Sequence, residues 1–121
     1  MLPQPNKLAS SADFRTVMKK GSRAGSRTVV VHYFEDRPED PPVVTGGPRC
    51  GLVVSKQVGN AVTRHAVSRK LRHVFAGLAD LPVHAHVVIR ALPASATATS
   101  EELDDDVRSC VRRARAKVKR Q

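Results

Sequence analysis

Hydrophobic and polar positions repeat along this chain with two periods, and each period predicts one type of element. Between 61 and 78 the apolar residues recur at intervals of three and four, the period of a helix with one buried face. That stripe consists of Val67, Leu71, Val74, Phe75 and Leu78. Residues 27–34 are rich in β-branched and aromatic residues, which predicts a strand. Two further strands are predicted over 49–56, whose apolar body is Gly51-Leu52-Val53-Val54, and over the apolar run 86–89, continued by Ala91.

Capping residues predict a first helix. Ser10 and Asp13 have the spacing of a capping box, and a glycine at position 21 suits a helix C-terminus, so we expect a short helix over about 11–20. The stretch 21–26 allows a short edge strand before the strand at 27–34.

Two later boundaries are also marked. Gly59 can take a positive φ in a turn, and Asn60 can then serve as the N-cap of the long helix. Thr99 and Glu102 form a second capping box, which predicts a last helix reaching about Lys117.

These elements predict an α+β fold in which three helices pack on one small mixed sheet of about four strands, in the order α-β-β-β-α-β-α. A length of 121 residues favours one domain, 1–121. We expect the ends, 1–9 and 118–121, to be flexible. The segment 35–48, with four acids and four prolines, predicts a mobile polar loop, and the small residues of 92–98 predict another loop.

The positions of the charged residues along the chain are more informative than the net charge. The chain has 21 Lys and Arg against 11 Asp and Glu, a net charge of +10. Between Arg49 and Phe75 there is no acid. The cations of this stretch are Arg49, Lys56, Arg64, Arg69, Lys70 and Arg72. Such a patch predicts binding to a polyanion, although charge alone does not distinguish RNA from DNA or an acidic membrane surface.

A second basic cluster lies in the tail. Its members are Arg108, Arg112, Arg113, Arg115, Lys117, Lys119 and Arg120. The acids of 101–106 precede it, so pairs at i, i+4 such as Asp104 with Arg108 can neutralise part of its charge. Contact with RNA and a solvated, frayed end are equally weighted for this tail.

The sequence gives little support for other classes of protein, such as disulfide-rich, metal-binding or membrane proteins. Cys50 and Cys110 are too few for a disulfide framework and lack zinc-site spacing, so we expect reduced thiols. His84 and His86 have no neighbouring cysteine or carboxylate to complete a metal site. No apolar run reaches the roughly 18–20 residues that span a bilayer, and no signal peptide is visible, which predicts a cytoplasmic protein.

One segment carries the strongest motif. Residues 52–72 read Leu-Val-Val-Ser-Lys-Gln-Val-Gly-Asn-Ala-Val-Thr-Arg-His-Ala-Val-Ser-Arg-Lys-Leu-Arg. This run resembles the signature of the bacterial ribonuclease P protein component, in which a strand ending in Ser-Lys leads through Gly-Asn-Ala-Val into an arginine-rich helix. Ala12-Asp13-Phe14, Pro93-Ala94 and Glu101-Glu102-Leu103 agree in order, so the resemblance covers nearly the whole chain.

The resemblance implies a protein subunit of ribonuclease P, a non-catalytic partner of an endoribonuclease whose RNA subunit removes the 5′ leader of precursor tRNA. It implies no catalytic residue, metal site or cofactor in the protein, with Mg²⁺ held by the RNA. The implied partners are ribonuclease P RNA and precursor tRNA, with neither a membrane nor a small-molecule substrate. It further implies a left-handed crossover between the strands at 49–56 and 86–90.

The resemblance also implies two binding sites. The residues expected to contact the catalytic RNA are Asn60, Arg64, His65, Ser68, Arg69, Lys70 and Arg72. A cleft between the first helix and the sheet would hold the single-stranded leader, lined by Phe14, Met18, Ser55 and Lys56.

The chain departs from the family pattern at four positions. Ala66 and Ser68 stand where the family usually has cations, so the contact set on the helix must differ. Met18 replaces a frequent second aromatic and gives a base less stacking surface. Arg90 lies one residue earlier than the usual arginine, and because a shift of one residue reverses strand facing we assign it no role.

Two other functions remain as alternatives. One is a ribosome-associated or general nucleic-acid-binding protein that uses the same basic helix. The other is a protein-only nuclease, which we rank last because the acids lie in a loop and beside arginines rather than in a metal-binding cluster. Taken singly, Phe14 suits a core position and Asn60 a simple helix cap.

Overall fold

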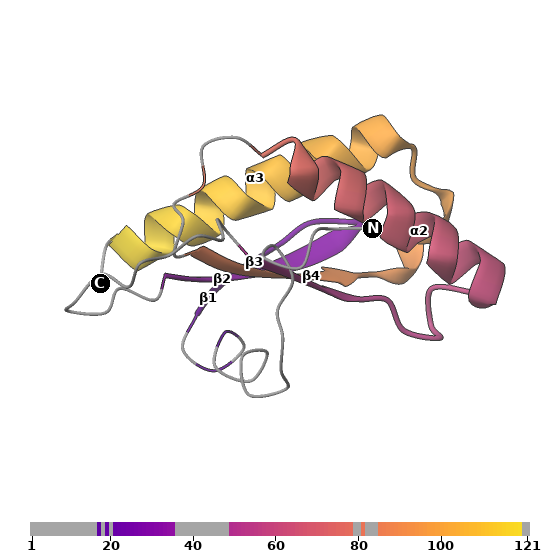
Figure 1. The fold of residues 1–121 in the computed structure, drawn as a ribbon, viewed down its shortest axis with the longest axis horizontal. Helices are drawn as coiled ribbons and strands as arrows, with labels where there is room; N and C mark the ends of the chain where they lie inside the picture. The colour runs from indigo at the N-terminus through magenta and orange to yellow at the C-terminus, as the bar shows by residue number, and fades with distance from the viewer. Residues whose placement is uncertain are drawn as a thin grey trace.

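The computed structural model describes residues 17, 19, 21–35, 49–78, 81 and 85–119. Figure 1 shows a sheet covered on one side by two helices. The strands are β1 (Ser22–Gly25), β2 (Val29–Glu35), β3 (Arg49–Val53) and β4 (Ala85–Ala91). The helices are α2 (Ala61–Ala76) and α3 (Ser100–Lys119), and a 3₁₀ helix, η2 (Pro93–Thr97), lies between β4 and α3.

The sheet has the strand order β1-β2-β4-β3 and is mixed. β2 pairs with β1 and with β4 in antiparallel fashion, whereas β3 and β4 are parallel. The predicted mixed sheet of about four strands, including the short edge strand, is therefore confirmed.

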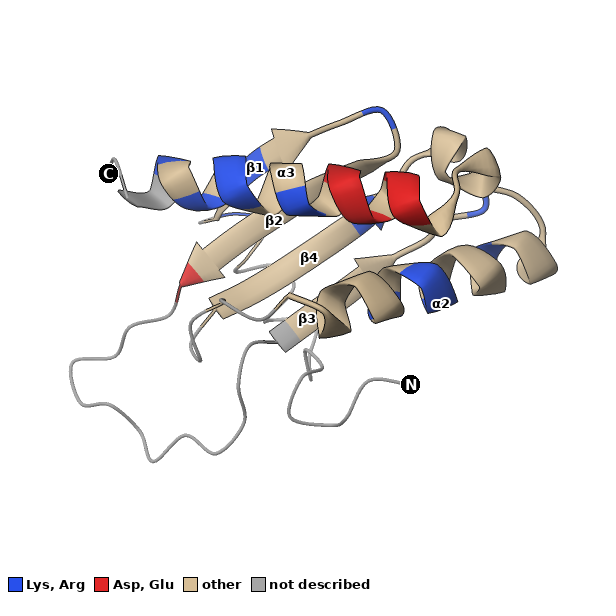
Figure 2. Ribbon diagram, turned by 90° about the horizontal axis from the view of Figure 1, so that it is seen from above, with Lys and Arg blue, Asp and Glu red and all other residues tan. Residues whose placement is uncertain are grey.

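The parallel pair β3 and β4 is joined through α2. Figure 2 views the sheet from the helix side, with β3 to the right of β4 along the direction of the strands. The chain leaves β3, passes in front of the sheet as α2 and returns on the left as β4. This is the left-handed sense that the resemblance implied, and the opposite of the usual rule.

The core fills the space between the sheet and the two helices. Strand alternation turns Val29, Val31 and Tyr33 of β2 toward the helices, and all three are fully buried. Val87 and Ile89 of β4 continue the same layer. The helices contribute Val67, Leu71, Val74 and Phe75 from α2, and Leu103, Val107, Cys110, Val111 and Ala114 from α3. The apolar stripe predicted for 61–78 is thus the inner face of α2.

Several boundaries differ from the prediction. β3 ends at Val53 rather than at 56, because the backbone turns there and the Val58 N–H donates to the Ser55 carbonyl at 3.1 Å. The predicted loop at 92–98 contains η2, which begins at a proline, a residue suited to a first helical position. Of the predicted first helix, only Val17 and Lys19 are described, and both are helical. The three-helix count is therefore not confirmed.

The capping box of α3 is present. The Thr99 N–H donates to Glu102 Oε1 at 3.0 Å, and the Glu102 N–H donates to Thr99 Oγ1 at 3.1 Å. The bond from the Thr99 backbone N–H, a hydrogen bond from the Thr99 side chain and the charge of Arg27 hold the pKa of Glu102 below its usual value. The capping box fixes the start of α3, the longest helix among the described residues.

Both cysteines are free and buried, as expected. Burial raises the pKa of the Cys50 thiol strongly, which makes the thiol unreactive. Within the described parts of the chain, no helix is long and apolar enough to cross a membrane.

The turn between β3 and α2 depends on two residues. Gly59 has φ +156°, within the region that favours glycine. The Asn60 side chain then accepts a hydrogen bond from the Thr63 N–H at 2.9 Å, so Asn60 is the N-cap of α2. Gly59 and Asn60 therefore fix where the basic helix starts and in which direction it leaves the sheet.

We predict that Gly59→Ala lowers the free energy of unfolding by about 1–3 kcal/mol, the cost of an unfavourable backbone conformation. The added Cβ would also stand 3.0 Å from Thr63 Cβ and Cγ2. Gly25→Ala is the matched control, since its Cβ would meet only Val30 Cγ2 at 3.6 Å, an ordinary contact. Urea unfolding measures both variants, and equal stability of the two would contradict the role given to Gly59.

Candidate RNA interface

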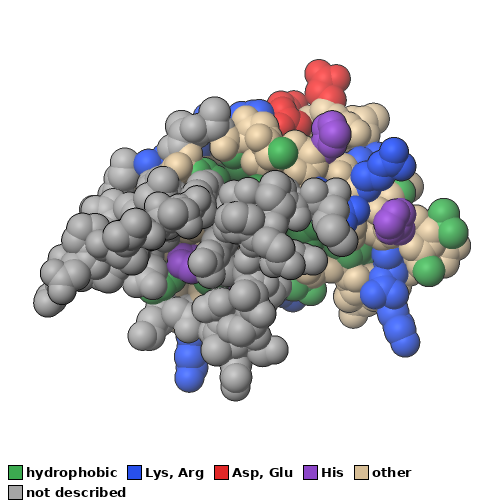
Figure 3. Space-filling view, viewed as in Figure 1, with side chains coloured by type: hydrophobic (Ala, Val, Ile, Leu, Met, Phe, Trp, Pro, Cys, Tyr) green, Lys and Arg blue, Asp and Glu red, His purple; other side chains and the backbone are tan. Residues whose placement is uncertain are grey.

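The outer face of α2 carries the charge predicted for it. His65, Arg69 and His73 are exposed, while Ser68 and Arg72 are half-buried beside them. Because the apolar stripe occupies the opposite side, these polar residues cannot turn inward without exposing the core. Figure 3 shows Lys, Arg and His side chains gathered over α2 on the right of the view.

Arg64 links α2 to the end of β3. Its Nε donates to the Val54 carbonyl at 3.1 Å, and the residue is half-buried. Ser55 and Lys56 follow directly and are exposed. The bond holds the Arg64 guanidinium over the strand end. A prepositioned cation loses less side-chain entropy when it binds a phosphate.

Lys70 points in a different direction. Its Nζ donates to the Ala98 carbonyl at 3.3 Å, so its ammonium lies over the segment before α3. It belongs to a groove of about 520 Å³ between α2 and the start of α3. The lining residues are Ala66, Arg69, Lys70, His73, Val74, Ser100, Glu101 and Asp104.

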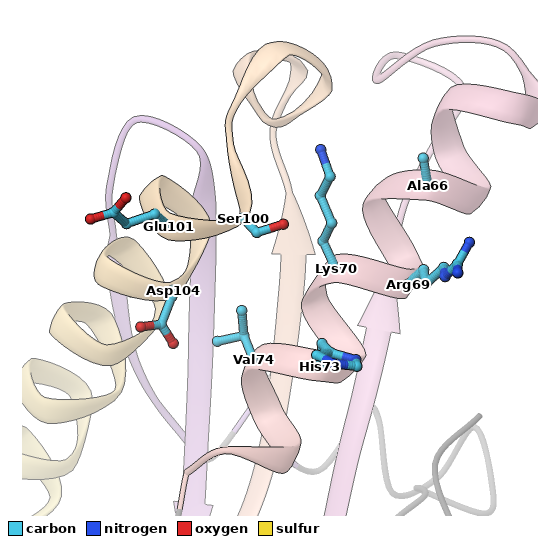
Figure 4. A pocket seen from close by; sticks show the side chains of 8 residues that line it. All are labelled: Ala66, Arg69, Lys70, His73, Val74, Ser100, Glu101 and Asp104. Atoms are coloured by element: carbon cyan, nitrogen blue, oxygen red, sulfur yellow. The ribbon is translucent and has the colours of Figure 1, made fainter.

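Figure 4 shows how this groove differs from the outer face of α2. Lys70 extends between the helices and the Ser100 hydroxyl points toward it, whereas Arg69 extends away from α3. The carboxylates of Glu101 and Asp104 come from the α3 side. Phosphates are therefore favoured on the outer face of α2 and disfavoured toward the acidic start of α3.

The predicted site residues thus fall into separate places. Arg64 lies at the strand end with Ser55 and Lys56, and the other α2 residues follow along the helix, with Lys70 turned toward α3. Asn60 is exposed, but its side-chain oxygen already caps α2. Phe14 and Met18, the residues expected to face the leader, lie outside the described residues.

A basic cluster that sequence reasoning missed lies on the other face of the sheet. His32 is 4% exposed, and its Nε2 has no hydrogen-bond partner among the described residues. Arg23 is its cross-strand neighbour on β1, and Arg90 is near it on β4. Burial, followed by the charges of Arg90 and Arg23, lowers the pKa of His32, so its imidazole is neutral at pH 7.

Strand alternation contained part of this signal. It places His32 and Phe34 on the face away from the helices, where Val17 and Val88 also pack. The position of Arg90 on that same face depends on the pairing of β2 with β4, which a single sequence does not reveal. In the part of the chain that the structure describes, no three His, Cys, Asp or Glu residues gather where they could hold a metal ion.

A cationic, acid-free helix face on a mixed sheet defines the class: a small α+β module suited to binding a polyanion. Comparison with known proteins identifies the family within this class. The model of the family described as Ribonuclease P matches residues 2–115. The chain therefore belongs to the ribonuclease P protein family.

Individual relatives of this chain carry the name of the same family. The chain is 54% identical over 112 residues to the "Ribonuclease P protein component" of Corynebacterium diphtheriae, covering 92% of this chain and 94% of that protein. It is 49% identical over 110 residues to the component of the same name from Rhodococcus opacus, covering 90% and 88%.

Solved structures share the fold. The ribonuclease P protein of Staphylococcus aureus matches with a TM-score of 0.74 at 24% identity, covering 90% of this chain and 94% of that one. The protein of Thermotoga maritima matches with a TM-score of 0.69 at 18% identity, covering 85% and 92%.

Proposed function

We propose that this ribonuclease P protein binds the catalytic RNA of the enzyme through the outer face of α2 and the adjoining end of β3. The observation that carries the proposal is the placement of the cations: Arg64 is fixed at the strand end and Arg69 stands exposed on the helix. No acid interrupts the chain between positions 49 and 75. Guanidinium groups held this way can each neutralise a phosphate and release its counterions.

The protein contributes binding rather than chemistry in this proposal. The catalytic RNA holds the Mg²⁺ ions and cleaves the 5′ leader, while the protein reduces the repulsion between the phosphates of two RNAs. We propose the cytoplasm as the place where the complex works. The acids of α3 support this division, since Asp104 pairs with Arg108 and Glu102 with Arg27 rather than facing a common metal position.

The leader of precursor tRNA is proposed to lie on the face of the sheet away from α2 and α3. Arg23 and Arg90 carry positive charge there beside His32, whose Nε2 has no hydrogen-bond partner in the described part of the chain. Phe14 and Met18 remain predicted contributors to this cleft, with Ser55 and Lys56 at its strand end. The two RNAs would then bind opposite sides of one sheet and its crossover helix.

A general nucleic-acid-binding protein is the rival function, and reconstitution separates the two. We expect the protein alone not to cleave precursor tRNA, and we expect it to raise cleavage by ribonuclease P RNA and to lower the magnesium concentration that the RNA requires. Bovine serum albumin and an unrelated basic protein serve as controls. Cleavage by RNA-free protein, or equal stimulation by the unrelated basic protein, would refute the proposal.

The α2 face can be tested by salt dependence. Arg69→Ala should weaken binding to the catalytic RNA and reduce the log–log salt slope by about 0.7–0.9, because one phosphate is no longer neutralised. Arg64→Ala should do the same and also remove the bond to Val54. Arg27→Ala removes the same charge at an exposed position paired with Glu102, so its slope should equal that of the wild type. A common slope for all three variants would contradict a specific role of the α2 face.

The leader site can be tested by comparing substrates. Phe14→Leu keeps apolar volume but removes the flat ring, so it should cost roughly 1–3 kcal/mol in binding precursor tRNA if a base stacks on Phe14. Mature tRNA lacks the leader, and its affinity should change little. The measurement is the ratio of the two affinities for the reconstituted enzyme. A lower melting temperature of the free protein with an unchanged ratio would make Phe14 a packing residue.

A further inference from the structure

A second groove lies between α3 and the segment that follows α2. Its volume is about 490 Å³, within the range of small-ligand sites. It is lined by Leu78, Leu81, Arg108, Val111, Arg112, Arg115 and Ala116. Among the described residues of this lining, four are apolar, three are arginines and none is a carboxylate. The groove therefore combines an apolar floor with a cationic rim.

Two of its arginines have partners in the fold. Arg108 Nε lies 2.9 Å from Asp104 Oδ1, and its Nη2 donates to the Gly77 carbonyl at 3.3 Å. Arg115 Nε lies 3.9 Å from Glu35 Oε1. These contacts hold the Arg108 guanidinium beside the end of α2 and place that of Arg115 near the end of β2.

Arg112 is different. It is exposed, and the structure shows no hydrogen bond or ion pair for it among the described residues. It stands four residues after Arg108 and three before Arg115, spacings at which like charges destabilise a helix. The helix dipole does not compensate, because α3 continues to Lys119 and the dipole acts only within the last turn. Arg108 and Arg115 lie near carboxylates, so Arg112 is the member of the row whose repulsion an anion would offset.

Two further cations of α3 are bonded to the sheet. Arg113 Nη2 donates to the Gly25 carbonyl at 2.9 Å, and Lys117 Nζ donates to the Arg23 carbonyl at 2.5 Å. Both therefore fasten α3 to β1. Figure 2 shows that the acids of α3 are confined to its first turns, with Lys and Arg beyond them. The groove thus lies along the part of the helix that follows its acids.

We propose that this groove binds one nucleotide of single-stranded RNA, with its phosphate on Arg112 and Arg108 and its base on the apolar floor. Single-stranded segments are favoured over duplex because only an unstacked base can enter, and guanidinium planes and apolar side chains both pack against bases. The groove lies next to the C-terminal end of α2, since Arg108 Nη2 donates to the carbonyl of Gly77, the C-cap of α2. The proposal rests on the proposed function in taking the RNA from the ribonuclease P complex.

Two pairs of matched variants test the groove in the full-length protein. Ala116→Leu fills the groove without changing charge, and Ala76→Leu makes the same change at an exposed α2 position outside it. Arg112→Ala removes the unpaired cation, and Arg27→Ala removes an exposed arginine elsewhere. Affinity is measured over a range of KCl concentrations, with ribonuclease P RNA alone and with precursor tRNA added.

We expect Ala116→Leu to weaken binding by at least about fivefold, the lower end for one stacked base, while Ala76→Leu binds as the wild type does. Arg112→Ala should reduce the salt slope by about 0.7–0.9, and Arg27→Ala should not. An effect with the catalytic RNA alone assigns the nucleotide to that RNA; an effect only when precursor tRNA is added assigns it to the precursor. Chemical probing of unpaired bases should find one base protected by the wild type and exposed in the Ala116→Leu complex.

The outcomes distinguish the groove from the α2 face. If Arg69→Ala weakens binding while Ala116→Leu and Arg112→Ala match their controls, the groove is not an RNA site and the proposed function stands. If Arg112→Ala alone has an effect, the nucleotide proposal is overturned, because the arginine then acts only as a distant charge. If Arg69→Ala is also without effect, the proposed function fails independently.

Discussion

The parallel pairing of β3 with β4 is the constraint on which the rest of the structure depends. Parallel neighbours cannot be joined by a hairpin, so the chain must cross one face of the sheet between them. That crossing is α2, and its inner stripe is buried against the sheet. The outer face of the same helix is left for solvent, and the basic residues lie there. One pairing thus determines both a core helix and a surface suited to RNA.

The helices α2 and α3 cover the same face of the sheet, and this separates two of the cationic surfaces among the described residues. The outer face of α2 is one of them. The other lies on the opposite face of the sheet, where Arg23 and Arg90 stand beside His32. Because β-strand side chains alternate, the sheet can bury Val87 and Ile89 toward the helices while presenting Arg90 on the other side. A small protein can in this way contact two RNAs without placing their phosphates side by side.

The charged residues of α3 have several different roles, which the net charge of the chain does not reveal. The acids at its start suit the positive end of the helix dipole, and Glu102 also closes the capping box. Arg113 and Lys117 bind carbonyls of the edge strand β1, which fastens the helix to the sheet. The tail is therefore not simply a solvated end in the part that the structure describes. Arg112 lacks such a structural partner there.

The sequence was sufficient for features that depend on neighbouring residues. The apolar stripe of α2, the Asn60 cap, the Thr99 capping box and the Asp104–Arg108 pair each follow from spacings of three or four residues, and all are present. The acid-free patch is likewise a local property of the chain. Only the tertiary structure could show that Lys70 turns toward Ala98, that Arg90 shares a face with His32, and that three arginines meet Leu78 in a groove. Those features depend on strand register and helix packing, which bring together residues far apart in the chain and which local periodicity does not specify.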